Sequence, residues 1–234
     1  MELSKRQHRF MAAIFFIIIL EFVGTIIKIF VGPPEDRITN ISMSLLCICM
    51  LAILFVPLFV NRLWHIRIPN SMYIIFVSFC FCGIMLGDVK NFYDRFARWD
   101  NILHFSSGML LAVLGFILVN TLNQSNRTSG IMLNPFFVAA VAFCFTMTIQ
   151  SLWEVFEFLS DEFLGTNAQT YMLTTTGSFI GATDVPLVGH EALRDTMVDF
   201  MLDGLGGLIV GTIGYFDLKH GKKSFSSEAL EQAE

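Results

Sequence analysis

The stretch ILHFSSGMLLAVLGFILVNTL, residues 102–122, decides the fold class of this chain. It is a predominantly apolar run, long enough to cross the roughly 30 Å hydrocarbon layer of a bilayer as an α-helix. It also contains His104, and an ionisable side chain in such a segment usually serves a function. The run therefore predicts a membrane-spanning helix that carries part of a polar site.

The composition of the whole chain supports the same class. Of the 234 residues, 54% are hydrophobic and 15% are charged, and the mean hydropathy is +0.64. These values are far from those of an ordinary soluble domain and predict an integral membrane protein. The formal net charge of -5 argues against nucleic acid as a partner.

Six apolar runs predict an all-α, polytopic membrane protein with about six transmembrane helices. They cover residues 11–31, 44–60, 72–86, 102–122, 132–159 and 197–215. The third run is short, so it is either a re-entrant segment or a span extended by Gly87 and Asp88. We expect one helical membrane domain over residues 1–223 and a disordered polar tail over residues 224–234.

The distribution of Lys and Arg predicts the orientation. If the N-terminus is inside, the inner segments hold nine basic residues: Lys5, Arg6, Arg9, Arg62, Arg67, Arg127, Lys219, Lys222 and Lys223. The outer segments then hold five: Arg37, Lys90, Arg95, Arg98 and Arg194. By the positive-inside rule, both termini of this multi-pass protein lie in the cytoplasm and the protein lies in the cell membrane.

Three of the predicted spans carry ionisable residues at helical spacing. They are Asp100 with His104, Glu154 with Glu157, and Asp195 with Asp199 and Asp203. Residues three or four apart share one face of a helix. In the predicted topology all three sets fall toward the outer end of the membrane, so we expect them to meet in one outward-facing pocket.

Such a pocket cannot consist of bare carboxylates, because like charges about 5 Å apart repel by roughly 3 kcal/mol at an effective dielectric constant of about 20. Bound cations, shared protons or basic groups such as Lys28 and Lys90 must compensate. Oxygen ligands favour Mg²⁺, Mn²⁺ or Ca²⁺, with Zn²⁺ also compatible through His104. All seven residues are candidate ligands of a divalent metal: Asp100, His104, Glu154, Glu157, Asp195, Asp199 and Asp203. His104, Glu154 and Glu157 are also the candidates for general acid–base catalysis.

A purely structural role is the alternative interpretation of these residues. Asp100 and Asp195 fit the first turn or N-cap of a helix, and His104 taken alone fits a packing position as well as a ligand position. Helix capping does not account for Asp199, Asp203 or the Glu pair.

Two further segments lie outside in the predicted topology. Residues 165–193 form either a lid or a poorly ordered outer loop. Residues 88–99 mix aromatic and charged side chains, which predicts a helix in the membrane interface or an aromatic anchor for the next span. On the sixth span, Gly204, Gly207 and Gly211 predict close approach of a neighbouring helix.

Several of these motifs resemble a known family. WDNILHF (residues 99–105) followed by Gly108, then WEVFE (153–157), DTMVD (195–199) and the glycine-rich helix are similar to the YjdF-like bacterial membrane proteins, an uncharacterised family. The resemblance covers residues 72–215 in order. A looser likeness is to the VanZ-like proteins, which are linked to teicoplanin resistance. These resemblances imply the fold and the site rather than a reaction.

Two classes of function follow from these residues. The pocket is either a metal-assisted enzyme or ligand-binding site for an envelope or lipid-linked substrate, or part of an ion- or proton-coupled transporter. A structural membrane protein is the third alternative. The sequence alone leaves open whether the protein is an enzyme and what its oligomeric state is.

Overall fold

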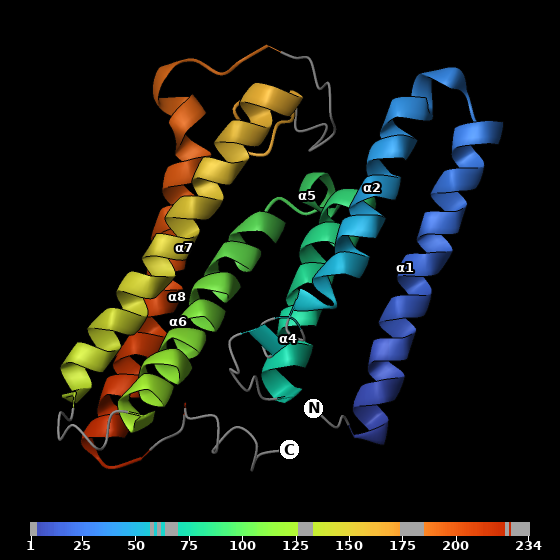
Figure 1. Ribbon diagram of the computed structural model, residues 1–234. Helices are drawn as coiled ribbons and strands as arrows, with labels where there is room; N and C mark the ends of the chain where they lie inside the picture. The colour runs from blue at the N-terminus through green and yellow to red at the C-terminus, as the bar shows by residue number, and fades with distance from the viewer. Residues whose placement is uncertain are drawn as a thin grey trace. The chain divides into compact units, whose positions relative to one another are not determined.

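The computed structural model describes residues 4–56, 59, 62–63, 70–125, 133–173, 185–222 and 225. These residues are mainly helical, and the β-type contact recorded among them is an isolated antiparallel bridge between Met172 and Pro186. Six helical segments in the described part are long and apolar enough to cross a membrane. The predicted all-α, polytopic class is therefore confirmed (Figure 1).

The elements follow one another with short connections. They are α1 (Lys5–Val31), η1 (Pro34–Asp36), α2 (Arg37–Ile53), α4 (Asn70–Cys80), η2 (Phe81–Val89), α5 (Phe92–Arg95), α6 (Trp99–Ser125), α7 (Pro135–Leu164), η4 (Gly189–Leu193) and α8 (Arg194–Lys219). Each of the six predicted spans overlaps one of the long helical segments, with ends that differ by up to about two turns.

Local chemistry explains where α7 begins and ends. The Asn134 side chain accepts a hydrogen bond of 2.7 Å from the backbone N–H of Phe137, and Pro135 occupies the first helical position, which is where proline is tolerated. Gly165 follows the last residue with φ of +65°, a left-handed conformation that commonly stops a helix. The helix thus runs past the predicted end at residue 159.

The helix that contains the short third run is long enough for a complete span. Helix α4 continues directly into η2, a π-helix, and together Asn70–Val89 make a 20-residue candidate span. The wider turns are visible in the bond from Lys90 N to the carbonyl oxygen of Met85, which joins residues five apart at 3.1 Å. The length of this segment fits a full span rather than a re-entrant one.

The chain divides into two compact units. The first comprises Met1–Asp100 and Phe158–Val188, and the second comprises Asn101–Glu157 and Gly189–Glu234. One membrane domain over residues 1–223 stays a prediction. The predicted tail over residues 224–234 lies outside the described residues apart from Phe225.

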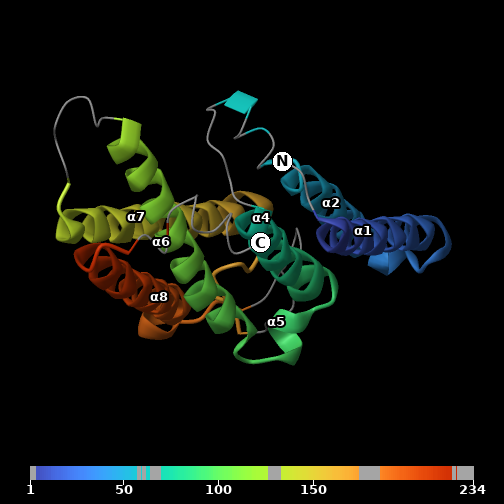
Figure 2. The ribbon, with the colours of Figure 1, turned by 90° about the horizontal axis from the view of Figure 1, so that it is seen from below.

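The first unit has its own core between α1, α2, α4 and η2. Its buried side chains include Ile18, Met50 and Val77. A buried hydrogen bond of 2.9 Å from Ser44 Oγ to Thr25 Oγ1 links α2 to α1, which lie side by side in Figures 1 and 2. Buried polar groups are stable when paired in this way.

Two charged residues of the first unit form an ion pair. Lys90 Nζ lies 2.6 Å from Glu21 Oε2. The charge of Lys90, one of the basic groups considered for the acidic pocket, is therefore matched by a carboxylate of its own unit.

The predicted interfacial helix over residues 88–99 is wrong in extent. Residues 88 and 89 end the π-helix, and α5 is a single turn that follows Asn91 in a left-handed conformation, with φ of 59°. Phe92 packs on Phe96 and Trp99 with ring centroids 4.8 and 5.0 Å away. This aromatic cluster lies at the start of α6, of which Trp99 is the first residue, and this agrees with the alternative prediction of an aromatic anchor.

In the second unit, close backbone contact joins α6 to α8. A Cβ atom at Gly108 would overlap the backbone of Asp203, and one at Gly206 would overlap the carbonyl oxygen of Phe105. Figures 1 and 2 show α6, α7 and α8 next to one another. Small residues permit this approach, and it brings the polar side chains of α6 against those of α8.

The glycines that make the closest approach are not the predicted ones. A Cβ at Gly207 would lie 3.3 Å from Phe143 and Thr146, which confirms Gly207 as a tight contact with α7. A Cβ at Gly204 would lie 3.6 Å from Met147, an ordinary van der Waals distance, and one at Gly211 would have no neighbour within 4 Å. The prediction for Gly211 is wrong, because a row of residues four apart drifts around the helix by about 40° per step.

The described parts of segment 165–193 fold onto each other. Leu187 N donates to Tyr171 O at 2.7 Å, and Leu173 N donates to Val185 O at 2.9 Å. These bonds join the described residues on the two sides of residues 174–184. Residues 174–184 lie outside the described part, and a lid role stays a prediction.

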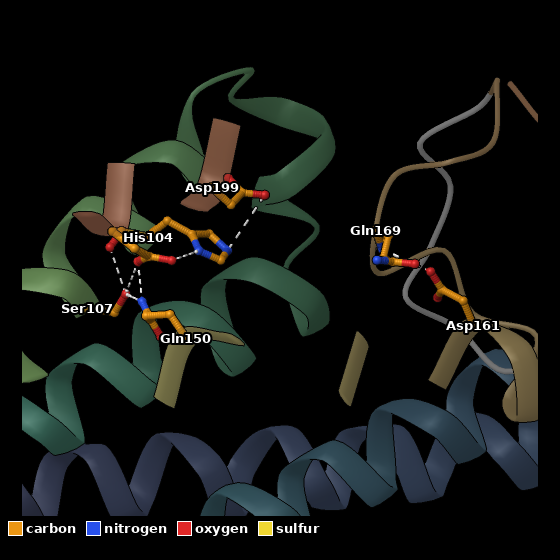
Figure 3. Close-up of polar contacts among 7 residues, drawn as sticks. His104, Ser107, Gln150, Asp161, Gln169 and Asp199 are labelled. Carbon is orange, nitrogen blue, oxygen red and sulfur yellow. Dashed lines mark hydrogen bonds and ion pairs between the residues drawn. The ribbon is translucent and has the colours of Figure 1, made fainter. Parts of the chain in front are cut away.

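The Asp161 carboxylate organises the start of this segment. It accepts hydrogen bonds from Thr166 Oγ1 at 2.6 Å, Ala168 N at 2.7 Å and Gln169 N at 3.0 Å. Figure 3 shows Asp161 beside Gln169. A buried carboxylate with three donors is well satisfied, so this residue has a structural role.

Candidate carboxylate–histidine site

The site lies among three helices of the second unit. Helix α6 supplies His104 and Ser107, α7 supplies Gln150, and α8 supplies Asp199. Figure 3 shows these four side chains close together around one further side chain that is not labelled. Dashed lines mark the contacts among the five. The spacing of ionisable residues predicted one polar site shared by α6, α7 and α8, and polar side chains of all three helices do meet.

A buried contact between ionisable groups joins His104 to Asp203. His104 Nδ1 lies 3.0 Å from Asp203 Oδ2, and the Asp203 side chain is fully buried. With Asp203 ionised, Nδ1 is the protonated nitrogen that donates to the carboxylate. In the neutral imidazole, Nε2 then carries the free lone pair.

Two neutral side chains hold the other oxygen of Asp203. Ser107 Oγ donates to Asp203 Oδ1 at 2.9 Å, and Gln150 Nε2 makes a short hydrogen bond to the same oxygen. Gln150 Nε2 also donates to Ser107 Oγ at 2.5 Å. Both Asp203 oxygens are therefore engaged, and this buried network fixes the carboxylate in one orientation.

Ser107 and Gln150 were not among the predicted site residues. The signal was present in their spacing: Ser107 lies three residues after His104, and Gln150 lies four residues before Glu154. Each therefore shares a helical face with a predicted site residue. Serine and glutamine are neutral, so a search for ionisable residues passes over them.

The second nitrogen of His104 faces another carboxylate. His104 Nε2 lies 4.0 Å from Asp199 Oδ2, and Asp199 is 2% exposed. Ligand atoms of Asp100, His104 and Asp199 lie within 4.8 Å of one another. Asp100 is the last residue of the first unit, but it stands one turn before His104 in the same unbroken helix.

These three residues have the chemistry of a metal site. Ligands that share one small cation are typically about 3 to 3.5 Å apart, so three ligand atoms within 4.8 Å of one another, with 4.0 Å between Nε2 and Oδ2, would have to move closer together around an ion. Metal-bound histidines commonly donate their other N–H to a carboxylate, which is the relationship between His104 and Asp203. The contact of Asp203 with Nδ1 is the contact that an orienting group makes, and its role as a metal ligand stays a prediction.

Glu154 is buried without a hydrogen bond. It is 4% exposed, and neither of its carboxylate oxygens has a partner. The charges of His104, Asp203 and Asp195 act on it, and the Thr196 hydroxyl is a neighbouring polar group. A buried carboxyl group in this state carries a large desolvation penalty.

Glu157 and Asp195 lie at the margin of the site. Both are half-buried, and both interact with other groups of the chain. Along α8 the acids become progressively less accessible, from half-buried Asp195 to Asp199 at 2% and Asp203 at 0% exposure. This gradient is one of burial among the helices, and the location of the acids toward the outer end of the membrane stays a prediction.

An apolar core lies on the other side of the Asp203 network. Its fully or nearly fully buried members in the second unit are Ala112, Phe116, Val138, Ala142 and Val210. These residues come from all three helices of the site. Between the polar network and the far ends of the helices, the described residues therefore include a tightly packed hydrophobic layer.

The fold and the site define a class: a multi-pass helical membrane protein with a buried carboxylate–histidine cluster. The chain belongs to the family described as "Predicted membrane protein (DUF2238)", whose model matches residues 10–220. It is similar to an uncharacterised protein of Thermotoga maritima, with 26% identity over 163 residues, or 69% of this chain and 70% of that relative. No solved structure matches the chain.

Proposed function

We propose that this protein binds a divalent metal at His104, Asp199 and Asp100 and uses it to act on an envelope or lipid-linked substrate. The observation that carries the proposal is the 3.0 Å contact between His104 Nδ1 and Asp203. It presents Nε2 to Asp199 in the way that an oriented metal ligand is presented.

The donor set supports particular ions. One imidazole nitrogen with two carboxylates suits Zn²⁺ or Mn²⁺, and Mg²⁺ or Ca²⁺ would rely more on the oxygens. A metal in this position would supply an activated water for hydrolysis. Glu154, which is buried and has no hydrogen bond, and Glu157, three residues later, are the candidates for moving a proton.

The location is part of the same proposal. The excess of basic residues in the inner segments supports a cell-membrane protein with both termini in the cytoplasm and the site toward the outer face. The finer resemblances to YjdF-like and VanZ-like proteins also belong to this proposal, and they support the fold and the site rather than a particular reaction.

Transport receives less support. A proton or ion path needs polar groups that continue through the membrane, whereas the Asp203 network is followed by the apolar layer of Ala112, Phe116 and Ala142. Ion flux into proteoliposomes that is abolished by Asp203→Asn would reverse this preference.

Metal analysis tests the proposed site. Protein purified in detergent should retain a divalent metal after gel filtration, and Asp199→Asn should lose most of it. Asp217→Asn is the matched control, since it makes the same change near the other end of α8. A wild-type protein that takes up no metal from buffers containing Zn²⁺, Mn²⁺, Mg²⁺ or Ca²⁺ would refute the proposal.

Cysteine labelling tests the location. Val188 is 87% exposed, so Val188→Cys in a background without other cysteines should react with a membrane-impermeant maleimide added to intact cells. Labelling only after permeabilisation would place this segment in the cytoplasm and overturn the outward-facing site.

A further inference from the structure

The Glu154 carboxylate is a second, separate feature of the polar cluster. It is 4% exposed and both oxygens lack a hydrogen-bond partner. The Asp203 carboxylate, on the neighbouring helix, is bonded at both oxygens. Buried polar groups in native proteins are normally paired. A carboxylate as buried as Glu154 and without a hydrogen bond therefore indicates a binding partner that is not part of this chain, such as an ion.

Glu154 does not belong to the His104 metal group. The described residues whose ligand atoms converge within 4.8 Å are Asp100, His104 and Asp199. Glu154 comes from α7, and its charged neighbour near the start of α8 is Asp195. Its partner must therefore occupy a position next to that group.

The charges of the second unit indicate the sign of this partner. Even a fully protonated His104 would offset only one of the buried carboxylates Asp199, Asp203 and Glu154. Arg194, the basic residue nearest in the sequence to the α8 acids, is exposed and lies 3.7 Å from Glu191. A cation is thus the natural partner of Glu154, because an anion would meet an excess of negative charge.

The neighbouring atoms indicate the kind of cation. Glu154 offers two carboxylate oxygens, the Thr196 hydroxyl and Asp195 lie near it, and Glu157 follows one turn later on α7. All are oxygen donors. Mg²⁺ and Mn²⁺ are commonly held by one or two carboxylates and several waters, with remaining positions open to a substrate.

We propose that Glu154, with Asp195 and the Thr196 hydroxyl, forms a second cation-binding position with oxygen ligands, of the Mg²⁺ or Mn²⁺ class, beside the His104 position. This inference rests on the proposed function, since it adds a neighbouring ion to the same site. With Glu154 holding that ion, Glu157 is the remaining candidate of the two for moving a proton. A pair of cations would let a negatively charged phosphate ester approach a cluster of carboxylates, as in two-metal phosphoryl-transfer sites. What we propose to bind at the second position is the cation itself, and not a particular substrate.

The experiment counts ions. Protein purified in detergent is stripped with a chelator, equilibrated with Mn²⁺ and analysed by mass spectrometry and electron paramagnetic resonance. The wild type should bind about two Mn²⁺ per chain and show a spin-coupled signal, as neighbouring ions in a two-metal site do. Glu154→Gln should bind about one and lose the coupling, and Asp195→Asn should weaken the same ion.

The control and the contrary outcomes separate the two proposals. Glu162→Gln changes an exposed acid of the same helix and should leave the count at the wild-type value. A wild type with one ion, or an unchanged count in Glu154→Gln, overturns the second position and leaves the proposed function standing. A wild type with no ion refutes both. Gel filtration and circular dichroism identify a variant that has not folded. If Glu154→Gln does not fold, the ion count of Asp195→Asn tests the second position instead.

Discussion

His104 and Asp203 are 99 residues apart in the chain, yet Nδ1 of the histidine lies 3.0 Å from a carboxylate oxygen of the aspartate. The contact exists because Gly108 and Gly206 let α6 and α8 touch at their backbones on either side of it. Helix packing and site geometry are therefore two consequences of the same few residues.

Asp203→Asn should weaken metal binding without preventing folding. The amide keeps the size of the side chain, but it has no negative charge and replaces one of the two carboxylate oxygens by an NH₂ group. The histidine therefore loses its charged orienting partner. Substitution of such orienting groups typically reduces metal affinity about 10- to 100-fold. Titration of stripped protein with Zn²⁺ or Mn²⁺ measures this change.

Ser107→Ala provides the graded comparison. It removes one donor to Asp203 Oδ1 and leaves the donor from Gln150 in place. The loss of affinity should be smaller than in Asp203→Asn. Wild-type affinity in both variants would show that the network does not orient the histidine.

Gly206→Ala should lower the melting temperature. Its methyl group would overlap the carbonyl oxygen of Phe105, so α6 and α8 would have to separate. Overpacking of this kind typically costs about 1 to 3 kcal/mol. Thermal unfolding followed by a thiol-reactive dye or by circular dichroism measures the change.

The same helix provides the matched control for this variant. A Cβ atom at Gly211 would have no neighbour within 4 Å, so Gly211→Ala should be close to neutral or slightly stabilising, because alanine favours helix. Equal changes in melting temperature in Gly206→Ala and Gly211→Ala would contradict the close approach of α6 and α8 at Gly206.

Chelation should destabilise the wild type selectively. A ligand present at about 100 times its dissociation constant stabilises the folded state by about 2.7 kcal/mol. Removing the metal with EDTA should therefore lower the melting temperature by roughly 5 to 10 °C for a chain of this size. Asp199→Asn, which lacks the ligand, should melt at the same temperature with and without EDTA.

Asp161→Ala should loosen the segment after α7. The substitution removes the acceptor for Thr166, Ala168 and Gln169. Amide hydrogen exchange over residues 165–173 should become faster, while exchange in the core helices stays unchanged. Glu162→Ala, at an exposed neighbouring position, should exchange like the wild type, and unaltered exchange in Asp161→Ala would mean that other contacts hold the segment.

The sequence predicted the six spans because hydropathy over about 20 residues is a direct consequence of bilayer thickness. Their ends were less accurate, since they depend on single residues such as Asn134 and Gly165 that act through capping and backbone conformation. The one-turn helix of residues 92–95 was predicted too long for the same reason: the left-handed Asn91 interrupts the chain locally.

The site was predicted in outline because charged residues are costly in apolar helices and usually serve a function there. Periodicity could place His104, Asp199 and Asp203 on shared faces. It could not predict which side chain each of them contacts, because those contacts depend on how far each helix is rotated toward its neighbour. The rotation is set by glycine contacts at Gly108 and Gly206, which the i,i+4 series of glycines on α8 did not indicate.

The π-helical segment Phe81–Val89 makes the length of the third span adjustable. A π-turn contains one residue more than an α-turn, so the loss of a single residue there would convert it to ordinary α-helix while the helix axis continues. In the other spans, a deletion would rotate every following side chain by about 100° and move polar positions to the wrong face. Relatives that differ in length within this helix should carry the change in this segment.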